Sequence, residues 1–452
     1  MIRRSIMQKS YSRDNTESFS LEGKLVVVLG AGRSGVAAAN LSVARGARVC
    51  LYDSREEVSL QGIHEDIEVY TSATSQTGES VHSDYLVISP GIDTYGEFVR
   101  AFQQNAGELL GELELGYRFY DGTCIGITGT NGKTTTTELV AHILNKLGRE
   151  ALPCGNHGVP LSELVLSGAP EYAVVEVSSF QLETISTFRS AVSLWLNLAP
   201  DHLDRYPSME AYREAKARIF EPLLPTDWKV SRKEEGLRFE QNHVTFSAAT
   251  TEADYHYLEG RICGAEELQV DLQKTRLRGL HNVENAMAAI ATVQCLGIEV
   301  NVPFEELMAG FAPPAHRCEF IRSLDGVEYI NDSKSTNLHS LETALNAFTQ
   351  PLIVIFGGKN KGLDYSPLKG KLAKNIKLCL SFGEIGSELE SLFADEVQTQ
   401  YCLSLEEAVL AARSNAQKGD YILFSPGTSS FDMYASYVAR GEAFRSIVND
   451  LS

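Results

Sequence analysis

The segment 124–140 reads as an apolar strand, a loop of small residues, and a helix that begins with a lysine and several hydroxyl side chains. Backbone N–H groups in such a loop converge on phosphate oxygens, and the N-terminus of the following helix adds positive potential. Lys133 can supply a mobile charge, and the Thr134 hydroxyl can ligate Mg²⁺. The segment therefore predicts an α/β domain that binds ATP. The residues expected to contact the nucleotide here are Gly129, Thr130, Asn131, Gly132, Lys133, Thr134 and Thr135.

The loop departs from the strict phosphate-loop pattern G-x-x-x-x-G-K-[ST] at one position, because Ile127 stands where the pattern has its first glycine. A glycine- and threonine-rich turn before an ordinary helix would fit the same residues. Such a turn does not need a lysine and consecutive threonines at the helix entrance. We therefore favour a variant phosphate loop.

The length of 452 residues suggests two to four domains, of which we expect three. Apolar residues at 43% and charged residues at 22% are ordinary for a soluble globular protein. The net charge of -19 opposes binding to nucleic acid and to anionic membranes. We find no long apolar run and a polar first stretch, so we expect a cytoplasmic protein, with Met1 or Met7 as the start.

The eight cysteines are scattered through the chain without a C-x-x-C pair, and most lie in apolar runs. This distribution favours reduced, buried thiols over disulfides or a structural zinc site. The cysteines are Cys50, Cys124, Cys154, Cys263, Cys295, Cys318, Cys379 and Cys402.

Short apolar runs alternate with helical stretches in three successive series, which predicts three α/β domains with mostly parallel sheets. We expect a loose extension over 1–22, a Rossmann-like domain over 23–118, a central ATP-binding domain over 119–313, and a C-terminal Rossmann-like domain over 314–452. The polar, short-period stretch between Trp228 and Leu277 predicts small antiparallel strands attached to the central domain.

A first glycine loop, Gly30 to Gly35, follows a strand and precedes Asp53 at the end of the next strand. Taken alone, this pattern is typical of a dinucleotide site and would indicate an NAD-dependent dehydrogenase. The pattern is weakly specific, and a dehydrogenase has no evident use for a second phosphate loop with a lysine. The dehydrogenase remains the rival from another functional class.

Two strings at the ends of buried strands carry a resemblance to a known family. They are Glu-Val-Ser-Ser-Phe-Gln-Leu-Glu at 176–183 and Asn-Leu-Ala-Pro-Asp-His-Leu-Asp-Arg-Tyr at 197–206. Together with the loop at 129–134, they resemble the Mur ligase family, and within it the members that add D-glutamate. Further matches occur in order at 281–285, 316–317, 331–337 and 425–432, so the resemblance covers nearly everything after residue 22.

The resemblance implies an ATP-dependent ligase that adds D-glutamate to UDP-N-acetylmuramoyl-L-alanine through an acyl phosphate, in peptidoglycan precursor synthesis. It implies small-molecule partners, Mg²⁺ at two sites and a monomer, with ATP held by residues of two domains. Another Mur ligase and a folylpolyglutamate-type ligase remain the close alternatives.

The resemblance also implies the catalytic and metal-binding residues. Thr134 and Glu176 would hold one Mg²⁺, and His202 would ligate a second metal. Lys216 shares a helical face with Tyr212, so it should point toward packed protein, although a lysine extending from an amphipathic helix would fit the same pattern. In the family this lysine is carbamylated by CO₂ and supports the metal site.

The remaining implied contacts fall into three groups. For ATP they are Asn285, Arg317 and Asp332, with Lys334 meeting both the nucleotide and the acyl phosphate. For the UDP-linked substrate they are Arg33, Ser34, Ser54, Arg55, Gly91, Asn156, Ser178 and His202, whereas Asp53 would be structural or a ribose neighbour. For D-glutamate they are Thr336, Lys361, Ser430 and Tyr437, and Lys359 remains an alternative to Lys361.

Overall fold

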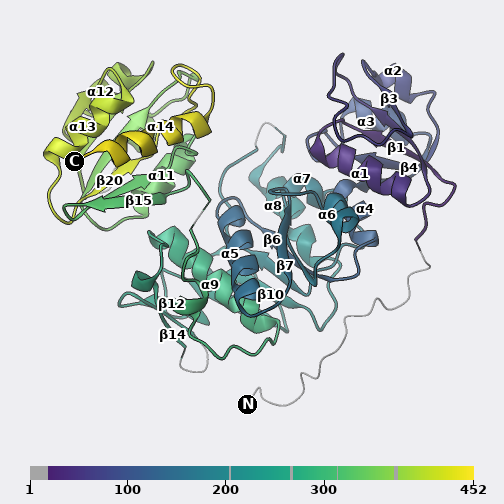
Figure 1. Cartoon of the computed structure of the whole chain (residues 1–452), viewed down its shortest axis with the longest axis horizontal. Coiled ribbons are helices and arrows are strands. Elements are labelled where there is room, and N and C mark those ends of the chain that lie inside the picture. The colour runs from purple at the N-terminus through teal and green to yellow at the C-terminus, as the bar shows by residue number, and fades with distance from the viewer. Residues whose placement is uncertain (1–18, 203–204, 265–267, 313, 371–374) are drawn as a thin grey trace. The chain divides into compact units, whose positions relative to one another are not determined.

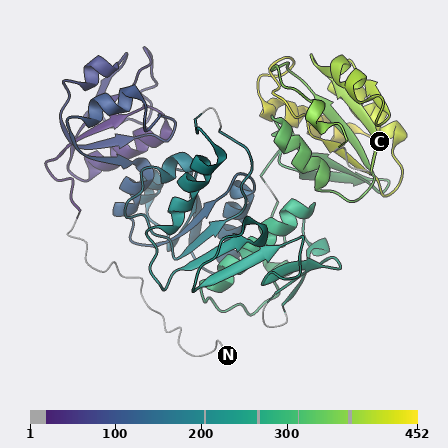
Figure 2. The same cartoon turned by 180° about the vertical axis from the view of Figure 1, so that it is seen from behind.

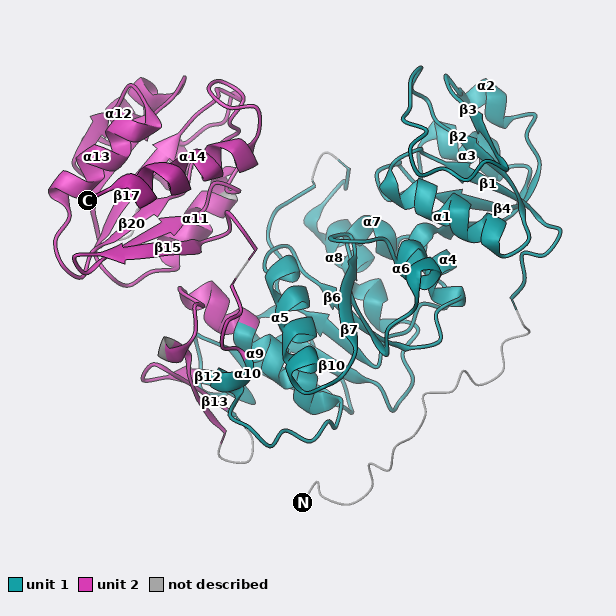
Figure 3. Ribbon diagram, viewed as in Figure 1, with its two compact units in different colours: residues 1–256, 264–267, 286–307 teal, residues 257–263, 268–285, 308–452 magenta. Residues whose placement is uncertain are grey.

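A computed structural model describes residues 19–202, 205–264, 268–312, 314–370 and 375–452 (Figure 1). Helices flank the sheets in the front view and in the view from behind (Figure 2). The chain divides into two compact units, residues 1–256, 264–267 and 286–307 in one, and 257–263, 268–285 and 308–452 in the other (Figure 3). The proposed starts Met1 and Met7, together with Leu203, Asp204 and Pro313, lie outside the described residues.

The first part of unit 1 is a five-stranded parallel sheet in the order β3-β2-β1-β4-β5. Its helices α1 and α3 supply apolar side chains to opposite faces of this sheet, since Ala38 and Leu41 pack in one core cluster and Val99 and Phe102 in another. The strands are β1 (Leu25–Leu29), β2 (Arg48–Tyr52), β3 (Ile67–Tyr70), β4 (Ser83–Ile88) and β5 (Ala106–Gly111). The helices are α1 (Arg33–Ala44), α2 (Ser75–Gly78) and α3 (Glu97–Gln103).

The turn between β1 and α1 brings backbone into very close contact. A Cβ at Gly35 would lie 1.8 Å from the carbonyl oxygen of Gly30, and Gly30 itself has a φ of 96°. Glycine is therefore required at both positions by geometry alone, whatever ligand the loop binds.

The second part of unit 1 is built around parallel strands in the order β7-β8-β6-β9-β10-β11-β12. The strands are β6 (Thr123–Thr128), β7 (Ala151–Gly155), β8 (Tyr172–Glu176), β9 (Val192–Trp195), β10 (Trp228–Arg232), β11 (His243–Ser247) and β12 (Tyr255–Leu258). The helices are α4 (Glu112–Arg118), α5 (Lys133–Lys146), α6 (Leu161–Ser167), α7 (Ser179–Leu182), α8 (Met209–Ala217) and α10 (Phe304–Leu307), with 3-10 turns η1 (Arg218–Phe220) and η2 (Lys233–Glu235). Helix α9 (Leu280–Cys295) belongs to unit 2 up to residue 285 and to unit 1 from residue 286.

The prediction of antiparallel strands after Trp228 is wrong for the first part of this stretch, up to β12. Strand β10 pairs in parallel with β9 and with β11, and β11 pairs in parallel with β12. Alternation of polar and apolar residues predicts that a segment is extended, but it carries no information about strand direction. Strands β13 (Arg261–Cys263) and β14 (Gln269–Asp271), before the turn η3 (Leu272–Lys274), form an antiparallel pair as expected.

The C-terminal part of unit 2 contains a six-stranded sheet in the order β15-β16-β20-β17-β18-β19, parallel except between β15 and β16. Helices α11 and α12 contribute to one core cluster, and α13 and α14 to the other. The strands are β15 (Glu319–Leu324), β16 (Val327–Asn331), β17 (Leu352–Gly357), β18 (Ile376–Phe382), β19 (Thr399–Tyr401) and β20 (Tyr421–Phe424). The helical elements are α11 (Leu338–Asn346), η4 (Ser366–Leu368), α12 (Gly386–Phe393), α13 (Leu405–Asn415) and α14 (Tyr437–Asp450).

The predicted α/β class with mostly parallel sheets is thus confirmed. Within the described residues, no helix combines the length and the apolar character that crossing a membrane requires. Six of the eight cysteines are buried, whereas Cys50 and Cys263 are partly exposed.

Candidate functional site

The loop between β6 and α5 is fastened to residues that follow the neighbouring strand β9. The backbone N–H of Thr130 donates to the Asn197 carbonyl at 2.9 Å, and that of Asn131 donates to Asn197 Oδ1 at 2.8 Å. Gly132 caps α5 with a φ of 84°, a conformation that favours glycine. These hydrogen bonds hold the loop against the residues that follow β9.

Lys133 folds back over this loop. Its ammonium donates to the carbonyl oxygens of Gly129 at 2.8 Å and Thr130 at 3.0 Å. The positive charge thus lies beside the helix N-terminus, where a phosphate group would gain from both.

Glu176 ends β8, the strand next to β6, and its side chain is 3% exposed. One carboxylate oxygen accepts a hydrogen bond from the Thr134 hydroxyl at 2.7 Å, and the other accepts one from Asn156 Nδ2 at 2.8 Å. Three residues singled out in the sequence thus meet from three different elements. They place oxygen ligands of the kind that Mg²⁺ prefers at the entrance of α5.

Lys216 lies on the buried face of α8, as the helical spacing predicts, and is 1% exposed. Its Nζ donates to the Gly129 carbonyl at 2.9 Å and lies 4.7 Å from the centre of the Tyr212 ring. Burial lowers the pKa of Lys216 well below its usual value, and the nearby charge of Lys133 lowers it further, although Asp201 and Glu176 oppose the shift. The neutral amine is therefore favoured far more than in a lysine exposed to water.

His202 lies at the Tyr212 end of this cluster. Its ring centre is 6.0 Å from that of Tyr212 and 4.8 Å from that of Phe180. The backbone φ of His202 is 53°, an unusual value for a residue with a side chain. Six other non-glycine residues in the described part of the chain share this conformation, so it does not by itself mark a functional site.

Five of the eight residues expected at the UDP end lie around the loops of the first sheet. Arg33 donates to the Gly158 carbonyl at 2.7 Å and pairs with Glu163 at 3.2 Å, so it contacts the segment that follows Asn156. Ser34 is partly exposed, and Ser54, Arg55 and Gly91 are exposed. These residues follow the carboxyl ends of parallel strands, where ligands bind in open α/β sheets.

Asp53 has a structural role in this loop. Its carboxylate accepts a hydrogen bond from the backbone N–H of Ala31 at 2.7 Å and pairs with Arg55 at 2.8 Å. The hydrogen bond from Arg55 is the main cause that lowers the pKa of Asp53 to about 2. A carboxylate engaged in this way closes the first glycine loop, which weakens the dinucleotide interpretation.

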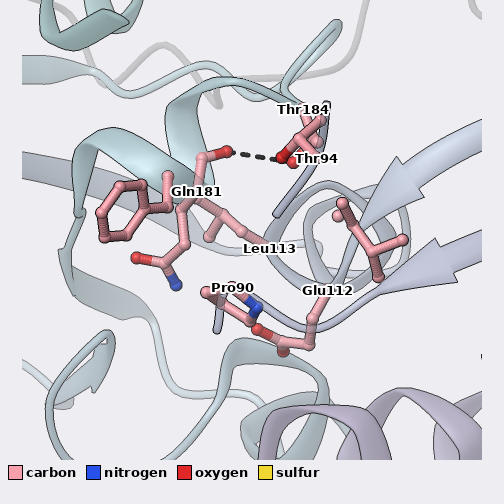
Figure 4. A pocket seen from close by; sticks show the side chains of 9 residues that line it. Pro90, Thr94, Glu112, Leu113, Gln181 and Thr184 are labelled. Carbon is pink, nitrogen blue, oxygen red and sulfur yellow. Dashed lines mark hydrogen bonds between the residues drawn. The ribbon is translucent and has the colours of Figure 1, made fainter. Parts of the chain in front are cut away.

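Sequence reasoning missed a small cavity behind α7 (Figure 4). The amide of Gln181 points into it beside Pro90 and Glu112, and Gln181 Oε1 accepts hydrogen bonds from the Ser178 backbone N–H and hydroxyl at 3.0 and 3.1 Å. Burial raises the pKa of Glu112 to about 7. The sequence feature that could have indicated this buried carboxyl is the string Gly-Glu-Leu-Glu-Leu at 111–115, in which two glutamates alternate with apolar residues.

In unit 2, the ends of β16 and β20 meet at Asp332. This carboxylate accepts a hydrogen bond from the Ser425 hydroxyl at 2.8 Å and from the backbone N–H of Cys318 at 3.1 Å. Burial raises the pKa of Asp332 to about 7, although these bonds and the charge of Arg317 oppose the shift. Asn285 is also buried, and its amide donates to Asn282 Oδ1 at 3.2 Å.

Residues expected to hold D-glutamate also gather in unit 2. Lys334 Nζ lies 5.3 Å from the centre of the Tyr437 ring, and Lys361 Nζ donates to the Thr336 carbonyl at 3.4 Å. Lys359, in contrast, is paired with Glu384 at 2.7 Å. Ser430 is buried, and the segment that precedes it is tied to this loop because the Lys359 N–H donates to the Ser429 carbonyl.

Three family models match the chain in order. The MurD-like N-terminal domain model of the Mur ligases matches residues 24–111, the Mur ligase middle domain model matches 127–293, and the Mur ligase glutamate ligase domain model matches 316–427.

Relatives named UDP-N-acetylmuramoylalanine--D-glutamate ligase match almost end to end. The protein of Chlorobium phaeobacteroides strain DSM 266 is 37% identical and the alignment covers 95% of this chain and 99% of the relative. The protein of Pelotomaculum thermopropionicum is 38% identical over 95% of this chain and 98% of the relative.

Solved structures share the fold. The UDP-N-acetylmuramate-alanine ligase MurC of Thermotoga maritima has a TM-score of 0.57 at 20% identity and covers 94% of this chain and 99% of its own. The MurF ligase of the same organism, solved in complex with ADP, has a TM-score of 0.57 at 17% identity and covers 95% of this chain and 96% of its own. From its full-length relatives and its three domain matches, the chain belongs to the Mur ligase family.

Proposed function

We propose that this chain is an ATP-dependent ligase that joins D-glutamate to the terminal carboxylate of UDP-N-acetylmuramoyl-L-alanine. The observation that carries the proposal is the 36–38% identity over about 95% of the chain to relatives bearing that name. The arrangement of Lys133, Thr134, Glu176 and Lys216 around one glycine loop supports it, because phosphoryl transfer needs positive charge and metal ligands at such a loop.

In the first step, a carboxylate oxygen of the UDP-linked substrate attacks the γ-phosphorus of ATP, and ADP leaves. The loop N–H groups and Lys133 would neutralise charge on the transferring phosphoryl group. Thr134 and Glu176 would hold Mg²⁺, since their oxygens already lie within 2.7 Å of one another. The bound ion would offset negative charge on the phosphates. Asn285, Arg317, Asp332 and Lys334 complete the proposed ATP-binding set.

Lys216 would act as a carbamate. Its neutral Nζ attacks the carbon of CO₂ and loses a proton, which turns an amine into an anion that supports the second metal site with His202. The burial of Lys216 and its lowered pKa support this step, because only the neutral amine is a nucleophile.

In the second step, the D-glutamate amine attacks the acyl phosphate, the carbon–oxygen bond to phosphate breaks, and phosphate leaves. Thr336, Lys361, Ser430 and Tyr437 would hold the amino acid. We favour Lys361 over Lys359 because the charge of Lys359 is already paired with Glu384.

The UDP-linked substrate would bind to the first sheet and its neighbouring loops, which we propose as a Rossmann-like domain over 23–118. The set is Arg33, Ser34, Ser54, Arg55, Gly91, Asn156, Ser178 and His202. The central and C-terminal domains would span 119–313 and 314–452. We further propose that the protein is a cytoplasmic monomer whose product enters peptidoglycan synthesis and so supports cell shape and division.

The test is release of ADP and phosphate by the purified chain with ATP, Mg²⁺, UDP-N-acetylmuramoyl-L-alanine and single amino acids. We expect turnover with D-glutamate and none when any one substrate is omitted. Turnover with L-lysine or meso-diaminopimelate but not with D-glutamate would contradict the proposal.

Lys216→Ala separates the carbamate from the rest of the site. We expect the variant to lose more than about 100-fold in kcat, since an anion at the metal site is missing. High bicarbonate should not restore activity, whereas a short carboxylate such as acetate should restore part of it. Unchanged turnover by Lys216→Ala would remove the proposed role of this residue.

A further inference from the structure

Arg440 occupies a core position of α14. It is spaced four residues from Phe444 and eight from Val448, both fully buried, and Arg440 is itself 0% exposed. A guanidinium in such a position is costly unless its charge and its five N–H groups are satisfied. Its partners therefore indicate what this side chain is for.

The hydrogen bonds of Arg440 all go to neutral oxygens. Its Nε donates to the Ser333 hydroxyl at 3.1 Å, and Nη2 donates to the carbonyls of Ser333 and Thr428, both at 2.9 Å. Within the described residues, Nη1 has no hydrogen-bond partner and the side chain forms no ion pair. Nη1 faces Gly358, where a Cβ would lie 3.0 Å away.

The segments that surround Arg440 are the ones that carry the proposed D-glutamate residues. Ser333 precedes Lys334 and Thr336, Thr428 precedes Ser430, and Gly358 precedes Lys361. Tyr437 begins the same helix, and its carbonyl accepts a hydrogen bond from the Ser333 hydroxyl at 2.8 Å. The buried Arg440 side chain thus contacts each of the three loop segments and lies on the helix that Tyr437 begins.

Two carboxylates act on the charge of Arg440, but neither forms an ion pair with it among the described residues. Lys361 adds positive charge on one adjoining loop, whereas the charge of Lys359 is taken up by Glu384. Among these carboxylates, Asp432 has the largest effect on the pKa of Arg440. Asp432 also accepts a hydrogen bond from the Glu384 N–H at 3.1 Å. Asp332 acts more weakly, and burial raises its pKa to about 7.

Arg440 itself remains charged. Burial lowers its pKa to about 10, and Asp432 and other neighbours oppose the shift. The side chain is therefore protonated at neutral pH, in a medium of lower dielectric constant than water, where a charge acts more strongly on its surroundings.

We propose that Arg440 is a specificity-determining positioning residue, whose buried charge, held by neutral oxygens and without an ion pair among the described residues, makes the amino-acid pocket prefer an acceptor with a second carboxylate. The proposal rests on the function proposed above. D-Glutamate carries a net negative charge, whereas D-glutamine has the same shape and no net charge. D-Glutamate would offset the positive charge beside the pocket, whereas D-glutamine would not.

The experiment compares kcat/KM for D-glutamate and D-glutamine in the full chain and in Arg440→Lys and Arg440→Met. Arg440→Met removes the charge, and we expect the preference for D-glutamate over D-glutamine to fall at least about tenfold, through KM for D-glutamate, with KM for ATP changed less than about threefold. Arg440→Lys keeps the charge, so its preference should stay within about threefold of the wild type.

Arg445→Met is the matched control. Arg445 lies on the same helix, but its charge is paired with Glu319 at 2.6 Å and with Glu442 at 2.9 Å. This variant should retain the wild-type preference. If Arg445→Met lowers the preference as much as Arg440→Met does, the inference is overturned.

The remaining outcomes also decide the matter. If Arg440→Met lowers kcat/KM equally for D-glutamate, D-glutamine and ATP, the role of Arg440 is purely structural and the proposal is overturned. An unchanged preference for D-glutamate over D-glutamine in this variant would also overturn it. If Arg440→Met does not fold, Arg440→Lys decides alone, since loss of the preference in that variant overturns it. Absence of turnover with D-glutamate in the wild type would instead refute the proposed function.

Discussion

Two glutamates of α4 lie two residues apart and are both buried, but their surroundings differ. Glu112 accepts a hydrogen bond from the Ser162 N–H at 2.7 Å, and its second oxygen has no partner within the described residues. Glu114 accepts bonds from the N–H groups of Ser186 and Thr187 and pairs with Arg118 at 3.0 Å. The number of partners, rather than burial, decides whether the charged form is tolerated.

This difference predicts opposite pH dependences of stability. Burial raises the pKa of Glu112 to about 7. Its contribution to the free energy of unfolding is therefore complete below about pH 4.5 and is lost as pH rises through 7. Burial alone would raise the pKa of Glu114, but hydrogen bonds from Ser186, Thr187 and Arg118 outweigh burial and lower this pKa. Its contribution is present at neutral pH and is lost as pH falls through that lowered pKa.

Glu112→Gln and Glu114→Gln test this pair by chemical denaturation between pH 5 and 8. Glu112→Gln should gain stability relative to the wild type as pH rises, by about 1–3 kcal/mol across the range. Glu114→Gln should lose about 3 kcal/mol at pH 7, because a bonded buried charge is removed from its partners. Parallel profiles for the two variants would contradict this account.

A second pair of residues tests the amino-acid pocket. Lys361→Met should raise KM for D-glutamate about 10- to 100-fold, which corresponds to the loss of one charge-assisted hydrogen bond. Lys359→Met is the control, since its partner Glu384 already takes up the charge. Steady-state kinetics with saturating ATP will show the difference, and a larger effect in Lys359→Met would reverse the assignment.

At the scale of elements, the sequence predicted the order of helices and strands along the chain well. It predicted the direction of the strands and their neighbours in the sheet poorly. The strand, loop and helix from 123 to 146 and the buried face of α8 follow from local patterns, because periodicity and turn residues are local. The parallel pairing of β10, β11 and β12 does not, because strand direction depends on the crossover connections. The contact of Asn156 with Glu176 likewise depends on β7 lying beside β8.

The turn between β1 and α1 offers a prediction for an element as a whole. A Cβ at Gly35 would collide with the Gly30 carbonyl, so Gly35→Ala should destabilise the first sheet by about 2–4 kcal/mol and raise KM for the UDP-linked substrate. Gly32→Ala is the control in the same loop, because nothing lies within 4 Å of a Cβ there. Thermal unfolding and substrate kinetics should separate the two, and equal stability would mean that the close contact is not real.

At the scale of the whole molecule, membership of the family was predictable from short strings that sit at strand ends. The residues that sequence reasoning missed, Arg440 and Glu112, are charged side chains in buried positions. Their importance could not be predicted because a single sequence does not reveal which charges are buried, or with which partners. The net charge of -19 gives no indication that a positively charged side chain such as Arg440 is buried.

The central claim is that the carboxylate of the UDP-linked substrate receives the γ-phosphoryl group before the amine attacks. It is tested by turnover of UDP-N-acetylmuramoyl-L-alanine that carries ¹⁸O in both oxygens of its terminal carboxylate. The account predicts one ¹⁸O atom in each released phosphate and one in the new amide, in equal amounts with ADP. Phosphate without ¹⁸O would show that its oxygen came from water and would contradict the account.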